Sequence, residues 1–250
     1  MGQHLEGRVT IVTGAGSGIG RATALALASA GAQVAVADLS VAAAQASVEQ
    51  IRQGGGQALA VEVDVADPEL VRSMMDRTHS ALGPVSILVN CAGICPTTPL
   101  LEVTLDEWNR VLAVNLTGAF LCAQAVLPDM MANQWGRIVN ISSLAGQVGG
   151  IIVGAHYAAS KGGLLALTKS LARVGAAYGI TANAIAPGTV DTPMRDNFAP
   201  ADQERLLGAA LVRRTARPDE ITAGVLYLVS EEAAYITGHT LAINGGAYMV

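Results

Sequence analysis

The stretch Thr13-Gly14-Ala15-Gly16-Ser17-Gly18-Ile19-Gly20 decides the fold, because the residue pattern changes across it. The segment Arg8-Val9-Thr10-Ile11-Val12-Thr13 before it is a short β-branched run, which is typical of a buried strand. An Ala- and Leu-rich segment follows to about residue 30, and Gly31 then favours a helix end. Glycines let the backbone turn tightly beside a pyrophosphate, and a helix N-terminus attracts negative charge. The stretch therefore predicts a dinucleotide-binding turn between a strand and a helix.

The rest of the chain continues this alternation of strand and helix patterns. Further strands are predicted at residues 33–37, 58–63, 86–90, 136–141, 180–185 and 240–243. Further helices are predicted at residues 41–52, from residue 68 onward, and at residues 104–131, 157–178 and 218–230. Thr104-Leu105-Asp106-Glu107 resembles a capping box. The alternation predicts one α/β domain over residues 1–250, with a doubly wound parallel sheet of seven strands and helices on both faces.

Length, charge and hydropathy argue against several classes of protein. The 250 residues suffice for one large domain, and no linker, low-complexity run or internal repeat divides them. The formal net charge of −5 gives no support for nucleic-acid binding. Apolar stretches are interrupted well short of the ~18 residues that a membrane span needs. Residues 1–8 lack the apolar core of a signal peptide. We therefore expect a small-molecule substrate and neither a nucleic-acid nor a membrane partner.

The three cysteines, Cys91, Cys95 and Cys122, do not suggest a disulfide framework. Their number is odd, their spacing is not that of a metal site, and no histidine cluster accompanies them. We expect a reduced, cytoplasmic protein without a metal site.

Tyr157 and Lys161 form the pattern Tyr-x-x-x-Lys within a segment of good helix formers. Residues four apart share a helix face, so the phenol and the ammonium point into the same space. A nearby cation lowers the pKa of a phenol from about 10 and prepares it for proton exchange near neutral pH. The same spacing is common on solvated helix faces. However, this chain has 13 arginines and only two lysines, which favours a task that needs a compact ammonium.

Asp38 closes the second predicted strand and is the residue expected to select the cofactor. A carboxylate there can accept both hydroxyls of an adenosine ribose and would repel a 2′-phosphate. No Arg or Lys follows it closely, and Ser17 stands where an arginine could bind that phosphate. We therefore expect NAD rather than NADP, with a solvated aspartate beginning a turn as the alternative. Asp64, at the end of the third strand, is placed to meet the adenine edge or to cap the next helix.

Together with other motifs, these features resemble the short-chain dehydrogenase/reductase family from about Leu5 to the C-terminus. The matching motifs are Thr13-Gly14-x-x-x-Gly18-x-Gly20, Asn90-Cys91-Ala92-Gly93, Asn115, Ser142-Ser143, Tyr157-x-x-x-Lys161 and Pro187-Gly188. The resemblance implies a single-domain Rossmann fold with strand order 3-2-1-4-5-6-7, oxidoreductase chemistry carried by a nicotinamide cofactor, and a homotetramer.

The resemblance also implies roles for individual residues. Tyr157 would exchange a proton with the substrate oxygen, Lys161 would lower the pKa of that phenol and hold the nicotinamide ribose, and Ser143 would orient the reacting oxygen. Asn115 would hold a water that links Lys161 to solvent. The residues expected to bind NAD are Gly14, Ser17, Gly18, Ile19, Gly20, Asp38, Asp64, Val65, Asn90, Ala92, Gly93, Tyr157, Lys161, Pro187, Gly188, Val190 and Thr192.

Several of these residues have a simpler structural explanation. Asn115 could satisfy a buried carbonyl, Ser142 and Ser143 could bond the local backbone, and Pro187-Gly188 could be a plain turn. The chain also departs from the family pattern at Cys91, where a second Asn is common and where we expect a side chain packed behind strand four. The Ser143–Tyr157 segment is about one residue longer than usual. A bulge in residues 147–154 would absorb the extra residue; otherwise Ser142 becomes the alternative to Ser143.

The substrate is expected among the loops after the fourth, fifth and sixth strands, at residues 94–98, 144–156 and 192–215. Residues 190–216 carry an apolar set suited to a lid over the ligand, or to a surface helix. The candidate substrate contacts are Ile94, His156 and Arg195. The last two could meet a carboxylate or a polyol hydroxyl, or could be solvated.

The leading functional hypothesis is an NAD-dependent oxidoreductase that interconverts a small secondary alcohol and its ketone. A polyol, a sugar-derived acid or a hydroxy acid is the expected substrate, and a 3-oxoacyl thioester is the main alternative. A nucleotide-sensing protein on the same fold would have no need for all four candidate catalytic residues. A lyase or epimerase would show no net cofactor reduction.

Overall fold

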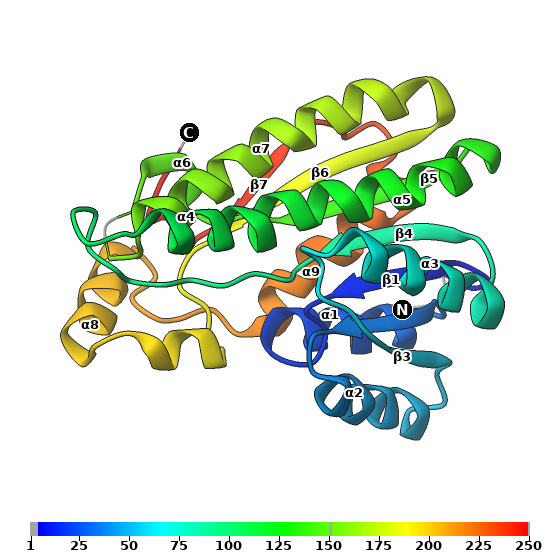
Figure 1. Cartoon of the computed structure of the whole chain (residues 1–250), viewed down its shortest axis with the longest axis horizontal. Helices are drawn as coiled ribbons and strands as arrows, with labels where there is room; N and C mark the ends of the chain where they lie inside the picture. The colour runs from blue at the N-terminus through cyan, green and yellow to red at the C-terminus, as the bar shows by residue number, and fades with distance from the viewer. Residues whose placement is uncertain (1–4, 151, 250) are drawn as a thin grey trace.

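The structure is a computed structural model that describes residues 5–150 and 152–249. Its centre is one sheet of seven parallel strands in the order β3-β2-β1-β4-β5-β6-β7, which confirms the predicted architecture (Figure 1). The strands are β1 (Val9–Thr13), β2 (Gln33–Asp38), β3 (Ala58–Glu62), β4 (Val85–Asn90), β5 (Gly136–Ile141), β6 (Ile180–Pro187) and β7 (Thr240–Ile243).

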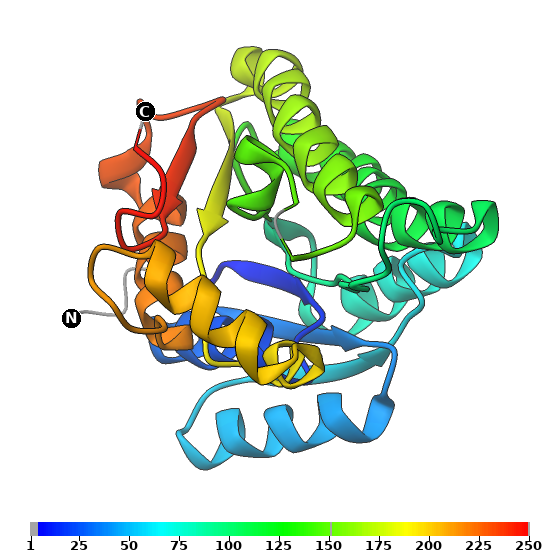
Figure 2. The ribbon, with the colours of Figure 1, turned by 90° about the vertical axis from the view of Figure 1, so that its left-hand side faces the viewer.

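Two layers of helices cover the two faces of the sheet (Figure 2). One layer consists of α1 (Gly18–Ser29), α2 (Val41–Gln53) and α9 (Pro218–Val229). The other consists of α3 (Pro68–Leu82), α4 (Leu105–Leu112), α5 (Gly118–Ala132) and α7 (Ala155–Gly175). The shorter elements are α6 (Ala145–Val148), α8 (Pro200–Ala209) and the 3₁₀ turns Ala176–Tyr178, Pro193–Asn197 and Glu231–Ala233.

The strands read as continuous apolar runs because both faces of the sheet are buried. In β1, Val12 packs in the hydrophobic cluster of the α1 side, whereas Ile11 packs in the cluster of the α3 side. In β2, Val36 and Ala35 divide between the same two clusters. Successive side chains of a strand therefore pack into two separate hydrophobic cores, one on each face of the sheet. These cores join the sheet to its two layers of helices.

The helix predicted over residues 104–131 is interrupted in the structure. A π-helical turn, Ala113–Thr117, joins α4 to α5. The predicted capping box is also only half formed: the Thr104 hydroxyl accepts a hydrogen bond from the Glu107 backbone N–H at 3.1 Å, but the Glu107 carboxylate bonds the Thr98 hydroxyl. Turns with an inserted residue are frequent at functional sites, and this one carries Asn115.

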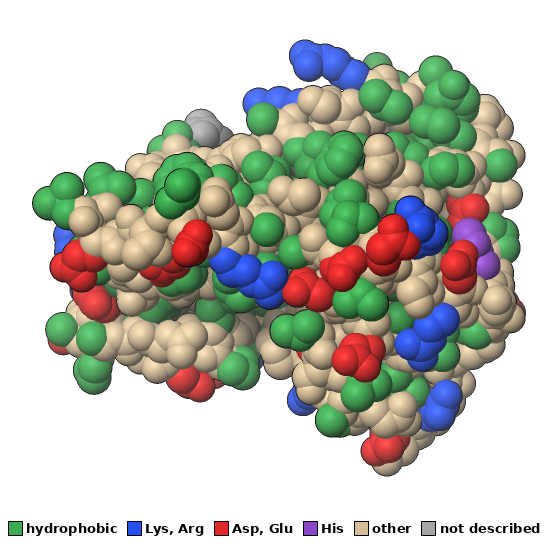
Figure 3. Space-filling model, viewed as in Figure 1, with side chains coloured by type: hydrophobic (Ala, Val, Ile, Leu, Met, Phe, Trp, Pro, Cys, Tyr) green, Lys and Arg blue, Asp and Glu red, His purple; other side chains and the backbone are tan. Residues whose placement is uncertain are grey.

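Taken together, α4, the π-helical turn and α5 (Leu105–Ala132) have the length and hydropathy of a membrane span. They are nevertheless part of the fold, because α5 packs against β4 and between α3 and α7. In the view of Figure 3, acidic, basic and hydrophobic side chains are interspersed on the surface.

The carboxyl ends of the strands meet at the point where the chain order reverses, between β1 and β4. Thr13 and Asn90 are paired there in register. The Thr13 hydroxyl accepts hydrogen bonds from the backbone N–H groups of Cys91 at 3.1 Å and Ala92 at 3.2 Å. A Cβ at residue 14 would lie 2.8 Å from the Cα of Ala92, and φ there is +64°, so only Gly14 fits. The two chain segments after β1 and β4 thus lie in direct contact.

The opposite end of the sheet is closed by a cluster around Trp135. The guanidinium carbons of Arg8 and Arg137 lie 3.6 and 4.3 Å from the centroid of the indole ring. Glu231 accepts hydrogen bonds from Trp135 Nε1 at 2.9 Å and from Arg137 at 3.3 Å. Arg137 is only 2% exposed, so its charge depends on this carboxylate and on the indole face.

We predict that Glu231→Gln lowers the free energy of unfolding by about 1–2 kcal/mol, because it weakens the pairing of a buried guanidinium. The matched control is Glu69→Gln, which breaks the exposed Glu69–Arg72 pair on α3 and should change stability by about 0.5 kcal/mol or less. Urea unfolding followed by circular dichroism measures both. Equal effects of the two substitutions would contradict this account of the Trp135 cluster.

Candidate active site

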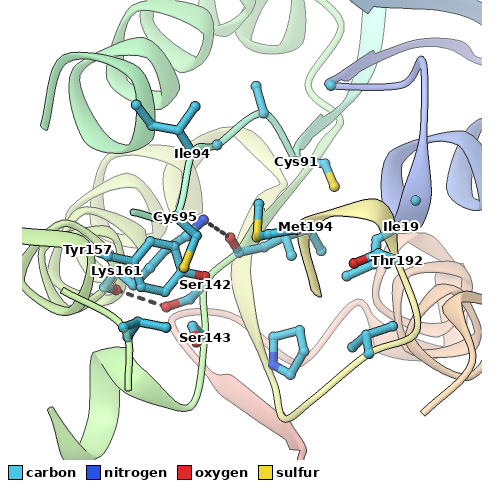
Figure 4. Close-up of a pocket in the computed structure, with 18 of the residues that line it drawn as sticks. Ile19, Cys91, Ile94, Cys95, Ser142, Ser143, Tyr157, Lys161, Thr192 and Met194 are labelled. Atoms are coloured by element: carbon cyan, nitrogen blue, oxygen red, sulfur yellow. Dashed lines mark hydrogen bonds between the residues drawn. The ribbon is translucent and has the colours of Figure 1, made fainter. Parts of the chain in front are cut away.

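A cavity of about 440 Å³ opens at the carboxyl ends of the strands. Figure 4 shows Tyr157, Lys161 and Ser143 grouped on one side of it, with Thr192 and Ile19 on the other. Every residue predicted to bind the cofactor, with the exception of Asn90, lines this cavity. Of the predicted catalytic residues, Ser143, Tyr157 and Lys161 line it, whereas Asn115 lies behind its wall.

The glycine-rich turn presents the N-terminus of α1 to the cavity. Ser17 is the N-cap residue, but its side chain caps no backbone N–H of the helix, and no acidic side chain occupies the first turn. A Cβ at residue 20 would collide with the Gly14 carbonyl, so the helix can start this close to the turn only because residue 20 is glycine. The first backbone N–H groups and the positive end of the helix dipole therefore remain available to an anion.

Asp38 lies at the end of β2 with its carboxylate fixed by backbone groups. Its Oδ2 accepts a hydrogen bond from Gly16 N at 2.8 Å and its Oδ1 accepts one from Ser40 N at 2.9 Å. A carboxylate has about four acceptor positions, so both oxygens can still accept ribose hydroxyls. The guanidinium of Arg21, on α1, donates to the Gly16 carbonyl and to Ser47 Oγ.

Asp64 does not cap the next helix, because Asp67 is the N-cap residue of α3; its contact with the adenine stays a prediction. Asp64 lines the cavity, and its Oδ1 accepts a hydrogen bond from Ala66 N at 3.0 Å at the start of the turn that leads to α3. Its Oδ2 pairs with the Arg110 guanidinium at 3.1 Å. Arg110 also lines the cavity, and sequence reasoning did not find it, because it comes from α4 and reaches the site only through the fold.

The side chain of Asn90 does not reach the cavity described above. Its Nδ2 donates to Asn140 Oδ1 at 2.9 Å and to the Ala119 carbonyl at 3.3 Å. Asn140 Nδ2 in turn donates to Thr168 Oγ1 at 2.9 Å. These buried polar groups link the ends of β4 and β5 to α5 and α7, so the structure gives Asn90 a supporting place beneath the site.

The two adjacent serines after β5 point to different partners. Ser142 is buried, and its hydroxyl donates to the Lys161 carbonyl at 2.8 Å. Both serines line the cavity. The Ser143 hydroxyl accepts a hydrogen bond from Ala145 N at 3.1 Å, and its interaction with the Tyr157 phenol lowers the pKa of that phenol. The segment between Ser143 and Tyr157 contains α6 and Gly149, whose φ is +87°. This geometry supports Ser143 over Ser142 as the residue that meets a substrate oxygen.

Lys161 is buried beneath Tyr157 on the same face of α7. Its ammonium lies 5.8 Å from the centroid of the Tyr157 ring and donates a hydrogen bond to the Ile141 carbonyl at 2.7 Å. Burial lowers the pKa of Lys161, and the neighbouring thiols of Cys91 and Cys95 act in the opposite direction. Its further ammonium protons remain available to a ligand in the cavity.

The pKa of Tyr157 differs from the value expected from the sequence. We expected Lys161 to lower it, but burial of the phenol raises it above its ordinary value, nearby Cys95 acts in the same direction, and the hydrogen bond with Ser143 lowers it only in part. The reason is the apolar packing of Tyr157 against Cys95 and Val111. In this structure the phenol therefore keeps its proton at neutral pH, which is the form that donates to a carbonyl oxygen.

Asn115 is held by the backbone of the loop after β4. Its Oδ1 accepts a hydrogen bond from Ile94 N at 2.8 Å, and its Nδ2 donates to the Ile94 carbonyl at 2.9 Å and to Ser160 Oγ at 3.0 Å. Both amide protons are therefore used, and one acceptor position on Oδ1 remains. A Cβ built on Gly93 would lie 3.2 Å from that oxygen and 3.5 Å from Lys161 Nζ. The role of Asn115 toward a water stays a prediction.

The three candidate substrate residues have different surroundings. Ile94 lines the cavity and is 36% exposed. Arg195 also lines it, but its guanidinium donates to Gln203 Oε1 at 3.0 Å and to Asp191 Oδ1 at 2.9 Å. His156 does not line the cavity; it is fully buried beside Glu107. The spacing in the sequence placed it next to Tyr157 but could not show that the two side chains diverge.

Two cysteines, Cys91 and Cys95, line the cavity. Cys91 packs against the hydrophobic cluster on the α1 side, as expected, and also faces the cavity (Figure 4). Burial raises its pKa to about 11 and that of Cys95 to about 12, so both thiols are protonated at neutral pH. The outer wall of the cavity is largely apolar, although Arg195 also belongs to it; its apolar residues include Ile94, Cys95, Val148, Val153, Met194, Phe198 and Leu206.

Comparison with known proteins agrees with this arrangement. A family profile described as Enoyl-(Acyl carrier protein) reductase matches residues 14–248. The 3-oxoacyl-[acyl-carrier-protein] reductase FabG of Vibrio cholerae serotype O1 is 40% identical over 248 residues, which cover 99% of this chain and 100% of that protein.

Solved structures show the same likeness. The crystal structure of a 3-oxoacyl-[acyl-carrier protein] reductase with bound NAD from Brucella melitensis matches with a TM-score of 0.93 at 35% identity, covering 99% of this chain and 94% of that chain. A short-chain type dehydrogenase/reductase from Mycobacterium marinum matches with a TM-score of 0.94 at 36% identity, covering 99% and 98%. The chain therefore belongs to the short-chain dehydrogenase/reductase family and is an oxidoreductase of that family.

Proposed function

We propose that the protein is an NAD(H)-dependent oxidoreductase that reduces a 3-oxoacyl thioester to the 3-hydroxyacyl thioester. The observation that carries the proposal is the apolar outer wall of the cavity, which lies directly beside Ser143 and Tyr157. The names of the relatives support the same substrate class.

The residues around the cavity fit a dinucleotide. The uncapped N-terminus of α1 offers backbone N–H groups to a pyrophosphate, and the glycines of the turn leave space for its approach. Asp38 would bind the adenosine ribose, and its charge disfavours a 2′-phosphate. Lys161 and Thr192 line the part of the cavity that would hold the nicotinamide end. When bound, the reduced nicotinamide would supply the hydride.

The protein groups would handle the substrate oxygen. Ser143 would donate a hydrogen bond to the carbonyl oxygen and orient it. Tyr157, which keeps its proton because it is buried, would transfer that proton to the oxygen as the alcohol forms. Lys161 would stabilise the phenolate left behind, since its ammonium is buried nearby and largely shielded from solvent.

A 3-oxoacyl thioester fits the cavity better than the polyol or hydroxy acid that we placed first from the sequence. Binding a polyol requires several polar partners, whereas the outer wall is formed mainly by aliphatic, aromatic and sulfur-containing side chains. The guanidinium of Arg195 is already paired with Asp191 and Gln203. An acyl chain would instead bury apolar surface against Met194 and Phe198, on the segment that we expected to act as a lid.

The predicted homotetramer remains part of this proposal. Two surfaces support self-association: the α5 and α7 layer exposes Phe120 and Val174, and the C-terminal segment exposes Met249. These side chains are 44%, 52% and 74% exposed in the single chain.

A substrate panel tests the function directly. Acetoacetyl-CoA, a longer 3-oxoacyl-CoA, small polyols and 2-hydroxy acids are incubated with NADH or NAD, and absorbance at the reduced cofactor's band is followed. We expect reduction of the thioesters, and we expect Tyr157→Phe to lower kcat by at least about 10²-fold, since it removes the proton donor. Tyr157→Phe should still bind NADH. Turnover restricted to polyols or hydroxy acids would refute the substrate class, and NADH binding without turnover would indicate a sensor.

Asp38 offers a second test, of the cofactor. We predict that Asp38→Ala weakens NADH binding, because the variant loses the acceptors for the ribose hydroxyls. We also predict that the preference for NADH over NADPH falls by about 10-fold or more, because the variant loses the charge that repels the 2′-phosphate. The ratio of kcat/KM for the two cofactors measures the effect. An unchanged ratio would show that another residue selects the cofactor. Asp64→Asn, just after the neighbouring strand β3, is the control, and we expect a smaller change in this ratio.

The adjacent serines provide a matched pair. Ser143→Ala should lower kcat by about 10²–10³-fold, because it removes a hydrogen bond to the oxygen on which charge develops. Ser142→Ala removes a bond to the Lys161 carbonyl and should affect stability more than kcat. Steady-state kinetics and thermal unfolding of both variants separate the two roles. The reverse order of effects would assign the catalytic role to Ser142.

A further inference from the structure

Thr98, Glu107 and His156 form a hydrogen-bonded cluster that the proposed reaction does not use. The Thr98 hydroxyl donates to Glu107 Oε1 at 2.6 Å, and His156 Nε2 lies 3.2 Å from the same oxygen. An ionised carboxylate only accepts, so Nε2 carries the proton. The three residues come from the loop after β4, from α4 and from the first turn of α7. The cluster therefore joins three separate segments at one oxygen atom.

The Glu107 carboxylate, at the centre of the cluster, does not complete the capping box of α4. In a complete capping box Glu107 would bond the backbone N–H of Thr104. Here it bonds the Thr98 hydroxyl and His156 instead, and these hydrogen bonds lower the pKa of Glu107. The group is therefore charged at neutral pH and can hold both donors.

The burial of His156 is energetically unfavourable in one respect. Its side chain is fully buried, and its Nδ1 has no hydrogen-bond partner within residues 5–150 and 152–249. An unpaired buried polar atom is unfavourable. The ring fits only because residue 154 is glycine, since a Cβ there would collide with the imidazole. The backbone N–H of Gly154 also donates to the Pro96 carbonyl at 2.9 Å, which ties the same loop to α7 a second time.

The loop held in this way forms part of the wall of the cavity. Ile94 and Cys95 line the cavity, and Cys95 packs with Val111 and Tyr157. Asn115 already fixes the start of the loop through both backbone groups of Ile94. The contact between Thr98 and Glu107 fixes its end, and His156, the residue immediately before Tyr157, ties that contact to α7.

We propose that Thr98, Glu107 and His156 are positioning residues that hold the loop at residues 94–98 against Tyr157 and so set the substrate side of the cavity. The effect on turnover rests on the proposed function. The effect on the loop does not, and it can be measured without a substrate.

The Cys95 thiol is the probe of the loop. Burial shields it and raises its pKa to about 12, so the native protein should react slowly with iodoacetamide. Pulse labelling with peptide mass spectrometry follows Cys95 separately from Cys91 and Cys122. We expect Thr98→Val and His156→Leu to label Cys95 at least about 10-fold faster, because each removes a hydrogen bond to a charged group.

Two variants serve as controls for the labelling. His156→Gln places an amide N–H near the position of Nε2 and should restore slow labelling. His79→Leu removes another histidine–carboxylate contact, with Asp129 at 2.6 Å on the layer of α3 and α5, and should leave Cys95 labelling unchanged. Thermal unfolding of each variant confirms that it is folded. If His156→Leu does not fold, Thr98→Val still tests the proposal, because Thr98 is partly exposed and its substitution disturbs the core less.

Kinetics supply the second measurement. In Thr98→Val we expect a KM for the thioester at least about 5-fold higher and a lower kcat. We expect an unchanged Kd for NADH, since the lost hydrogen bond is with Glu107, which is not among the residues expected to bind the cofactor. Equal Cys95 labelling in wild type, Thr98→Val and His156→Leu would overturn the proposal. Faster labelling in a protein that reduces no thioester would support the loop-holding role while refuting the proposed substrate class.

Discussion

The contact between the segments after β1 and β4 is the constraint on which the site depends. The Thr13 hydroxyl accepts hydrogen bonds from two successive backbone N–H groups, those of Cys91 and Ala92. Gly14 permits this approach, since a Cβ there would meet the Ala92 backbone. One side of the contact carries the turn that would bind the cofactor, and the other carries the loop that reaches the substrate side. A single pair of neighbouring strands therefore brings together the two halves of the proposed reaction.

Desolvation dominates the electrostatics of the site. Burial raises the pKa of Tyr157 and lowers that of Lys161, so it opposes charge on both groups. The hydrogen bond from Ser143 acts against this effect at the phenol. A phenol that holds its proton until the substrate oxygen becomes basic suits reduction of a carbonyl. The same dry surroundings would strengthen the attraction between Lys161 and the phenolate that forms.

The sequence predicted the features that depend on local pattern. The strands at residues 136–141 and 240–243 have the predicted bounds, and the glycine-rich turn lies where its motif placed it. The features that it missed depend on packing between distant segments. Asn90 turns toward Asn140, His156 turns away from the cavity, and Arg110 enters it from α4. Spacing along the chain shows which residues share an element, but not which neighbour fills the space beside each of them.

The π-helical turn Ala113–Thr117 also limits how this chain can change. It holds one residue more than an α-helical path of equal rise would need, and Asn115 lies in that excess. Deleting one of these residues would let the segment close into ordinary α geometry while α4 and α5 keep their relative orientation, because the π turn absorbs the extra residue locally. The Asn115 side-chain amide would then lose its hydrogen bonds with the backbone of Ile94. A one-residue deletion here would therefore leave the helix intact but would release the loop that forms part of the cavity wall. Conservative substitutions at neighbouring positions would leave both in place.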